Sequence, residues 1–224
     1  MILITRPEDD AKKLSMILDD EKIVIIDLRN KIDKGSYESF LQGHIPGAIH
    51  SDYLKDGWRV GRDGVVGLLP QAEQFEGLAR RLGVSDDTHV VVVPAGVSST
   101  DFGSAARAYW TFKVFGHDNV SVLDGGYAAW RAFAPGKIET GAFIAPEPGS
   151  FVARFNPQYY IGKADVALRR CRFIAASSGC AETPIWRWGY VETLSTSLHL
   201  IELGFDAEGR AMLALAKAMQ MVSI

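Results

Sequence analysis

The amino-acid sequence predicts an α/β domain with a mainly parallel central sheet flanked by helices. Two observations support this prediction. The apolar, β-branched runs Lys22–Arg29 and His89–Pro94 are too short for ordinary helices and are typical of buried strands. Around them, helix-like and strand-like segments alternate along the chain, which is the order expected of parallel strands joined by helices.

The segments before and after the first strand follow this pattern. Apolar residues at 14, 17 and 18 share one helical face and predict a helix ahead of the strand. A polar stretch covers residues 30–39, and Gly and Pro in the segment Gly43–His50 predict a tight turn ahead of a short strand. Residues 51–70 show no clear period and are expected to form a long surface loop.

The next elements are more regular. Apolar residues recur at helical spacing over Gln71–Leu82, and Gly83 suits a left-handed stop. A second helix is expected over Phe102–Phe115, a strand over Asn119–Asp124, and a short helix from Gly125 to Trp130. These segments place a complete domain within residues 1–135.

The rest of the chain loses this alternation. Residues 136–155 are rich in Pro and Gly and are expected to be a linker. Within the short segment 156–224, Arg172–Ser178 could be a strand, and only Ala207–Met221 clearly predicts a helix. Its methionine-rich apolar positions suggest that this helix could dimerise, although the sequence leaves the oligomeric state open.

Composition and charge exclude several classes of function. The chain has 24 basic and 27 acidic residues and no basic block, so a nucleic-acid partner is not expected. No apolar run approaches the roughly 20 residues of a membrane helix, and no signal peptide is evident, so a cytoplasmic location is expected. The five histidines and two cysteines show no metal-ligand spacing, and neither a metal nor another cofactor is predicted.

The loop after the central strand is the expected site, because ligands of such sheets bind at the carboxyl ends of the strands. It runs from Ala95 to Asp101 and contains no cysteine. Asp101 is expected to cap the following helix. The candidate substrate-binding residues are the polar side chains of this loop and one arginine on the helix, namely Ser98, Ser99, Thr100 and Arg107.

Three segments together carry a resemblance to a known family. They are IIDLR followed by FLQGHIPGAIH, then VVVVPAGVSSTDFGSAARAYWTF, then GHDNVSVLDGGYAAW. In this order, over Ile23–Trp130, they resemble the rhodanese family of sulfurtransferases. The resemblance implies a rhodanese-like fold and transfer of sulfane sulfur from a small anionic donor, thiosulfate or 3-mercaptopyruvate, to cyanide or a thiol. The sulfur is carried as a cysteine persulfide.

The loop departs from the family pattern, which has the carrier cysteine first in this loop. A serine cannot replace it as a sulfur carrier, so the loop is expected to be inactive. It is most similar to the cysteine-less first units of tandem rhodaneses. A whole second unit does not fit in residues 156–224, which also lack second copies of the motifs, so this segment is expected to be a shortened or divergent second unit.

Three hypotheses about function therefore stay open. The chain could be an active sulfurtransferase that uses Cys180 or, less readily, Cys171. It could be a cysteine-less binding or regulatory module, or a truncated descendant with little activity. Arg29 and His44 are residue types that often take part in catalysis. Here they are expected to hold the end of the first strand to the neighbouring turn.

Overall fold

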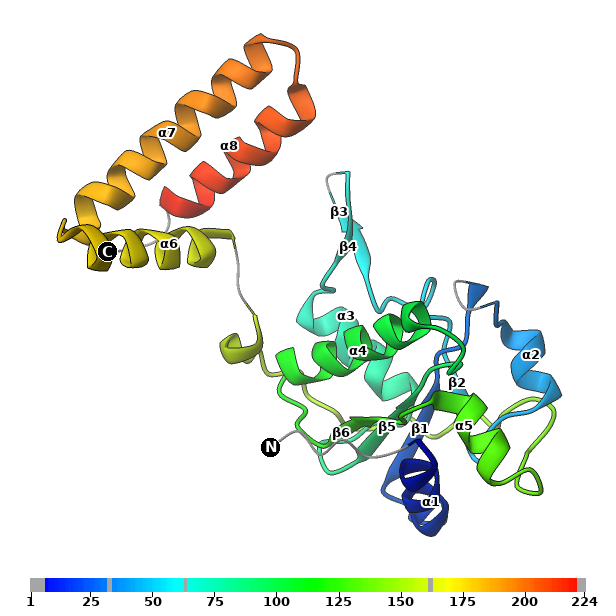
Figure 1. Cartoon of the computed structure of the whole chain (residues 1–224). Helices are drawn as coiled ribbons and strands as arrows, with labels where there is room; N and C mark the ends of the chain where they lie inside the picture. The colour runs from blue at the N-terminus through cyan, green and yellow to red at the C-terminus, as the bar shows by residue number, and fades with distance from the viewer. Residues whose placement is uncertain (1–6, 32–33, 63, 161–162, 221–224) are drawn as a thin grey trace. The chain divides into compact units, whose positions relative to one another are not determined.

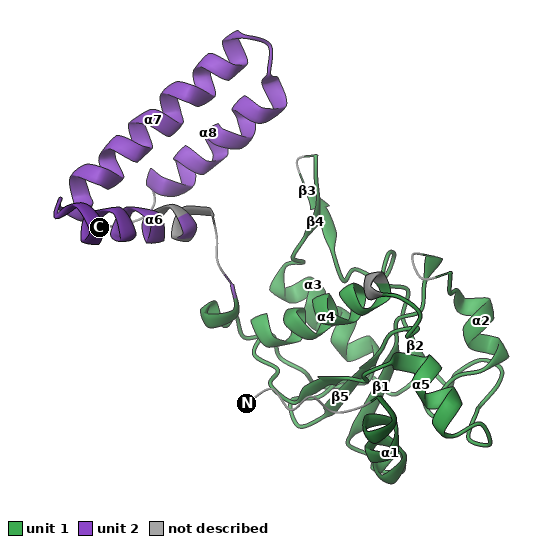
Figure 2. Ribbon diagram, viewed as in Figure 1, with its two compact units in different colours: residues 1–159 green, residues 160–224 purple. Residues whose placement is uncertain are grey.

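The structure is a computed structural model, and it describes residues 7–31, 34–62, 64–160 and 163–220. The chain forms two compact units, unit 1 over residues 1–159 and unit 2 over residues 160–224 (Figure 2). Each unit is described below by itself.

Unit 1 is built on a four-stranded parallel sheet with the strand order β2-β1-β5-β6. β1 and β5 form its centre, and their apolar residues are buried between the helices seen on the two faces in Figure 1. The predicted parallel sheet flanked by helices is confirmed. The strands are β1 (Ile23–Asp27), β2 (Ile49–His50), β5 (His89–Val93) and β6 (Val120–Val122).

The strand β5 shows why its residues form a buried strand. Val90 and Val92 enter one apolar cluster, which also holds Phe75 and Phe112. Val91 and Val93 enter a second cluster with residues of α1 and α5. Successive side chains point to opposite faces, so a continuous run of valines fits a strand covered on both sides. The helices are α1 (Pro7–Ile17), α2 (Tyr37–Gln42), α3 (Ala72–Arg81), α4 (Ser99–Val114) and α5 (Gly126–Phe133).

Residues 51–70 are not all loop, contrary to expectation. They contain an antiparallel pair, β3 (Val60–Arg62) and β4 (Val65–Leu68). Both strands are very short and at least partly exposed, so they leave no apolar alternation in the sequence. Trp58, which precedes them, is completely buried.

The segment expected to be a linker, residues 136–155, belongs to unit 1. Phe151 is almost completely buried beside Phe75, at a ring distance of 5.9 Å. Its backbone N–H donates to Val84 O at 3.1 Å, and a Cβ on Gly149 would lie 2.0 Å from the same oxygen. The segment has little regular structure of its own, as its Pro and Gly content predicts. Its backbone is held by the loops of the domain instead.

Unit 2 contains only helices among its described residues. They are α6 (Lys163–Ser178), α7 (Glu182–Glu202) and α8 (Asp206–Gln220), with a 3-10 turn, η2 (Pro157–Tyr159), just before the unit. The strand expected over Arg172–Ser178 is wrong, because this run continues α6, and a short apolar run does not by itself distinguish strand from helix. The helix expected over Ala207–Met221 is confirmed as α8, although Met221 lies outside the described residues.

A small apolar cluster and one close crossing hold unit 2 together. Cys171, Trp186 and Met219 are its buried residues, one from each helix. Where α7 and α8 cross, a Cβ on Gly209 would lie 2.5 Å from Ile201 Cγ1. A glycine at this position lets the two helices approach closely.

His117 in unit 1 gives a pH-dependent prediction. It is buried between Phe112 and Phe151, and burial lowers the pKa of its imidazole from the ordinary value of 6.5, against smaller opposing effects of Thr88 O and Asp86. Below pH 6.5 the unfolded chain therefore binds more protons than the folded one, and unit 1 loses stability as the pH falls through this range. Urea unfolding between pH 7.5 and 5 should show this loss.

The His117→Gln variant is the control for this prediction. Its stability should fall less with pH than that of the natural chain. Burial also lowers the pKa of half-buried His89, so part of the dependence of stability on pH remains in both proteins. Identical slopes for the two proteins would contradict the assignment to His117.

Candidate functional site

The loop between β5 and α4 lies at the carboxyl end of the central strand, as the sequence predicts. Ser98 is the N-cap of α4, and its hydroxyl accepts a hydrogen bond from the backbone N–H of Asp101. Asp101 is therefore the third residue of the helix, and its expected position as the N-cap is wrong. The two residues form a reciprocal capping box, in which the Asp101 carboxylate accepts from the Ser98 N–H.

The Asp101 carboxylate does more than cap the helix. It accepts backbone N–H hydrogen bonds from Gly96 at 2.6 Å, Val97 at 2.9 Å, Ser98 at 3.1 Å and Phe102 at 2.8 Å. The residue is only 1% exposed. Converging N–H groups at a helix N-terminus form a cradle for an anion. In this protein a carboxylate of the chain itself occupies that cradle.

The loop is also packed tightly against the start of α5. A Cβ on Gly96 would lie 1.9 Å from Gly125 O, and a Cβ on Gly126 would lie 2.2 Å from Pro94 O. The backbone N–H of Tyr127 donates to Pro94 O at 2.9 Å. These contacts fix the loop in a form that keeps its N–H groups pointed at Asp101.

Two cavities flank the loop and differ in charge. The smaller, of about 280 Å³, is lined by the acidic residues Asp101 and Asp124 together with backbone of the loop and of α5. The larger, of about 430 Å³, is lined by Ala95, Val97 and residues of α5, and its charged groups are Arg29, Lys34 and Arg131. Coulomb attraction therefore favours the larger cavity for a small anion.

The candidate binding residues of the sequence are not all brought together. Ser98 lines the smaller cavity. Ser99 and Thr100 form the first turn of α4, and their side chains lie outside what the structure describes. Arg107 lines neither cavity. Its guanidinium donates to Gly67 O at 2.9 Å and lies 4.6 Å from the Trp110 ring.

Both cysteines belong to unit 2, and both are free thiols. Cys171 is buried, and burial, with a smaller effect of the Glu182 carboxylate, raises the pKa of its thiol. A raised pKa disfavours the thiolate that sulfur transfer requires. Cys180 is exposed and directly precedes Ala181, the N-cap of α7.

Arg29 and His44 have the structural roles that the sequence predicts. The Arg29 guanidinium donates to the Asp27 carboxylate at 2.8 Å and to Gly43 O at 2.8 Å. The His44 ring stacks on Phe40 at 3.9 Å, and its Nδ1 is 2.9 Å from Phe40 O. These contacts hold the end of β1 to the turn after α2.

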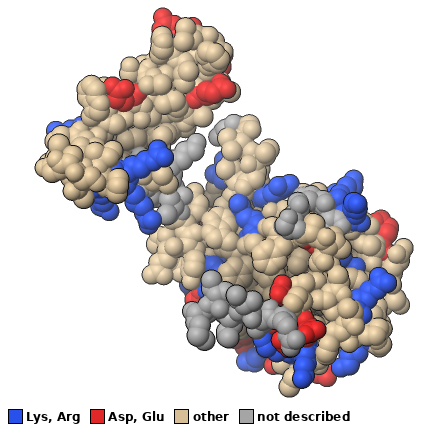
Figure 3. Space-filling view, viewed as in Figure 1, with Lys and Arg blue, Asp and Glu red and all other residues tan. Residues whose placement is uncertain are grey.

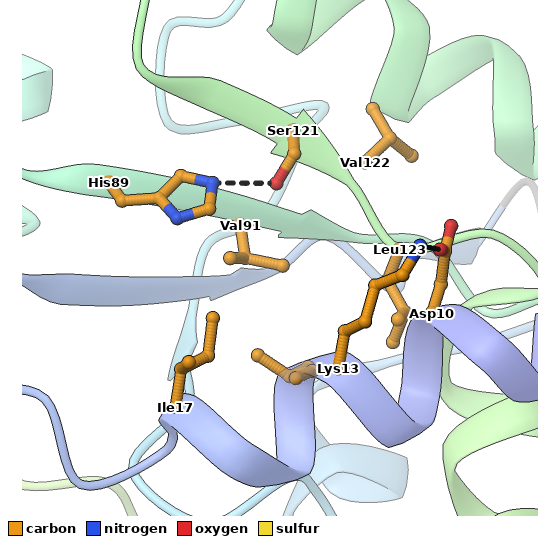
Figure 4. Close-up of a pocket in the computed structure, with 9 residues that line it drawn as sticks. Asp10, Lys13, Ile17, His89, Val91, Ser121, Val122 and Leu123 are labelled. Carbon is orange, nitrogen blue, oxygen red and sulfur yellow. Dashed lines mark hydrogen bonds and ion pairs between the residues drawn. The ribbon is translucent and has the colours of Figure 1, made fainter. Parts of the chain in front are cut away.

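A third cavity lies beneath α1, away from the loop (Figure 4). It has a volume of about 300 Å³ and is lined mainly by apolar residues of α1, β5 and β6. His89 and Ser121 contribute its main polar contact, at 2.9 Å, and Lys13 pairs with Asp10 at its edge. This cavity offers shape and apolar surface rather than a charged site.

Sequence reasoning missed the occupied cradle and the basic groups of the larger cavity. The pattern Ser98-x-x-Asp101 contained a signal for the first, because a serine followed three residues later by an acid is a capping box. No local pattern pointed to Lys34 and Arg131. They meet at one cavity because β1 pairs with β5 and because α5, which carries Arg131, is bonded to the loop after β5 through Tyr127 N–H and Pro94 O.

Comparison with known proteins agrees with this fold. Residues 10–133 match the rhodanese-like domain family, and the chain belongs to that family. The chain is 37% identical over 164 residues to 3-mercaptopyruvate sulfurtransferase of Escherichia coli K12, covering 70% of this chain and 55% of that protein. It is 33% identical over 153 residues to the putative thiosulfate sulfurtransferase SseB of Mycobacterium tuberculosis, covering 66% of this chain and 51% of that protein.

The solved structures include the same class of protein. The crystal structure of SseA from Escherichia coli, a 3-mercaptopyruvate sulfurtransferase, matches with a TM-score of 0.58 at 32% identity, covering 76% of this chain and 62% of that one. The chain spans about half the length of the curated relatives named above. Among the residues described by the structure, no helix has the length and apolar character needed to cross a membrane.

Proposed function

We propose that this chain takes part in sulfane-sulfur transfer of the 3-mercaptopyruvate/thiosulfate type, with its rhodanese-like domain as the non-catalytic unit. The donor is a small anion, and the acceptor is a thiol or cyanide. In this proposal the loop from Ala95 to Asp101 does not carry the persulfide. The sulfur is carried by a cysteine of a separate catalytic unit, outside this chain. The two free thiols support a cytoplasmic location, where cysteines stay reduced.

The observation that carries the proposal is the Asp101 carboxylate within the loop. Four backbone N–H groups that could stabilise a persulfide or an anionic donor are bonded to it instead. An anionic donor would also meet the charges of Asp101 and Asp124 in the adjoining cavity. The loop therefore lacks both the nucleophile and a free anion site.

A second candidate, an active sulfurtransferase using Cys180, is favoured by one observation. Cys180 is exposed and stands at the N-terminal end of α7, where the helix dipole favours a thiolate. Its thiolate would attack the sulfane sulfur of thiosulfate, forming the persulfide and releasing sulfite. Cyanide would then take the outer sulfur as thiocyanate and restore the thiolate.

Sulfur loading separates the two candidates. The full chain is incubated with thiosulfate or 3-mercaptopyruvate and freed of excess donor. Its intact mass is then measured, together with the thiocyanate formed on adding cyanide. The first proposal expects no added sulfur and no thiocyanate. The second expects one added sulfur atom, lost in Cys180→Ser and kept in the control Cys171→Ser.

A double variant without Cys171 and Cys180 cannot form a persulfide, because these are the only cysteines of the sequence. Sulfur retained by Cys180→Ser but lost in Cys171→Ser would contradict the role given to burial of Cys171. If no sulfur is taken up, the alternative of a binding or regulatory module predicts that residues 1–159 retain a protein partner in a pull-down.

A further inference from the structure

The α7 helix of unit 2 exposes an apolar stripe that none of the described residues of the unit covers. Trp188, Val191 and Leu198 are 66%, 52% and 54% exposed. Ser195 and Glu202 are exposed as well, and the spacing of three, four, three and four residues places all five on one face of the helix. A contiguous apolar face of this kind marks an interaction surface.

The apolar positions of α8 are used differently. Met219 is 2% exposed in the cluster with Cys171 and Trp186, and Leu215 packs against it. The sequence suggests that α8 could dimerise through such positions, but in the structure Leu215 and Met219 pack inside unit 2. The face of α7 is the better candidate for contact with another molecule.

Charge differs between the two ends of this face. Arg187 stands at its beginning, where α6 contributes Arg169, Arg170 and Arg172, the last of which lies 3.3 Å from Glu182 of α7. The other end carries acidic residues. Glu202 closes α7, and Asp206 and Glu208 lie in the first turn of α8. Figure 3 shows positive charge gathered over α6 and negative charge along α7 and at the α7–α8 end.

We propose that two copies of this chain pair through the exposed face of α7, antiparallel and about a two-fold axis. The small Ser195 lies near the axis. Val191 then packs beside Leu198 of the partner subunit, and Arg187 lies beside Glu202 of the partner subunit. The two-fold axis produces each of these contacts twice.

The charge complementarity of the face selects a second antiparallel copy as the occupant. The face is complementary to itself only when reversed, because a parallel pair would place Arg187 beside Arg187 and Glu202 beside Glu202. A two-fold pair is also closed, so it forms dimers rather than filaments. Within its own chain, Glu202 has His199 at 3.7 Å, on the same exposed helix end, and that contact leaves it accessible.

The size of the face sets the expected strength. At 1.5 Å per residue, Arg187 and Glu202 are about 22 Å apart along the helix, so the paired helices meet over roughly four turns. Such a contact is at the small end of specific interfaces. We therefore expect a weak, reversible dimer.

Sedimentation velocity of the full chain over a wide concentration range tests this proposal. The natural chain should shift from monomer to dimer. Arg187→Glu and Glu202→Arg should each weaken self-association at least tenfold, because each places like charges together twice. An equimolar mixture of the two variants should form a heterodimer, since each of its two pairs then joins one acidic and one basic side chain.

Further variants test whether the dimer forms through this face or through another surface of the chain. Leu198→Asp should also abolish the dimer, and the control Lys12→Glu, an exposed charge reversal on α1, should leave it unchanged. A chain that stays monomeric at every concentration would overturn the proposal. So would a dimer that is insensitive to Arg187→Glu, or a mixture of the two charge variants that does not associate. The circular dichroism spectrum of each variant should match that of the natural chain, so that weaker association does not reflect a loss of helix.

Discussion

Replacing Asp101 with alanine is expected to lower the free energy of unfolding of unit 1 by about 3 kcal/mol. The carboxylate is buried and accepts hydrogen bonds from four backbone N–H groups. Hydrogen bonds to a charged acceptor are the strong ones, and each buried donor left without a partner costs about 1–3 kcal/mol. The adjoining cavity lets water replace part of this loss. Urea unfolding followed by tryptophan fluorescence measures the effect.

The same variant tests whether the loop is an anion cradle. With the carboxylate gone, its N–H groups are available to sulfate or thiosulfate, so millimolar concentrations of either should restabilise Asp101→Ala more than they stabilise the natural chain. Asp101→Asn is the matched control, because it retains a side-chain oxygen as an acceptor and should lose less stability. An Asp101→Ala variant as stable as the natural chain, or one indifferent to these anions, would refute the assignment.

The Arg29→Ala substitution is expected to cost about 3–5 kcal/mol, because it leaves a buried carboxylate without its counter-charge. Arg29 and Asp27 side chains are 6% and 0% exposed, and their charged atoms are 2.8 Å apart. The guanidinium also stacks on the Tyr127 ring at 4.0 Å and binds Gly43 O. Guanidinium chloride unfolding of the full chain, with a probe in unit 1, gives the change in unfolding free energy.

The double variant Asp27→Asn, Arg29→Met measures how much of the stabilisation comes from the interaction between the two side chains. It removes both charges and keeps much of the volume, so it should cost clearly less than the sum of Asp27→Asn and Arg29→Met measured singly. Additive losses would show that the two side chains act independently. A loss below about 1 kcal/mol in Arg29→Ala would show that water reaches Asp27 and screens it.

The order of residues alone is enough to predict the sheet of unit 1 and its family. The run His89–Pro94 favours a strand, because four successive β-branched valines are typical of a strand covered on both faces. The helix over Gln71–Leu82 likewise follows from its period. In the structure α3 ends at Arg81, and Gly83, with a φ of 77°, follows its C-cap residue. The missing cysteine in the loop was equally plain from the sequence.

Other features depended on tertiary contacts that local pattern does not encode. Residues 136–155 have the composition of a linker, yet Phe151 is buried in the domain core because Val84 and its neighbours hold the segment in place. The run Arg172–Ser178 suits a strand or a helix, and its place in α6, which packs on α7, makes it helical.

The candidate site divides in the same way. That the candidate loop follows the central strand, and that it lacks a thiol, could both be predicted, since both follow from residue identity and order. The folded contacts were needed to show that Asp101 fills the anion cradle and that Arg107 bonds to Gly67 instead of entering the neighbouring cavities. The direction of a side chain depends on which backbone groups the fold brings within hydrogen-bonding distance, and a one-dimensional pattern does not contain those distances.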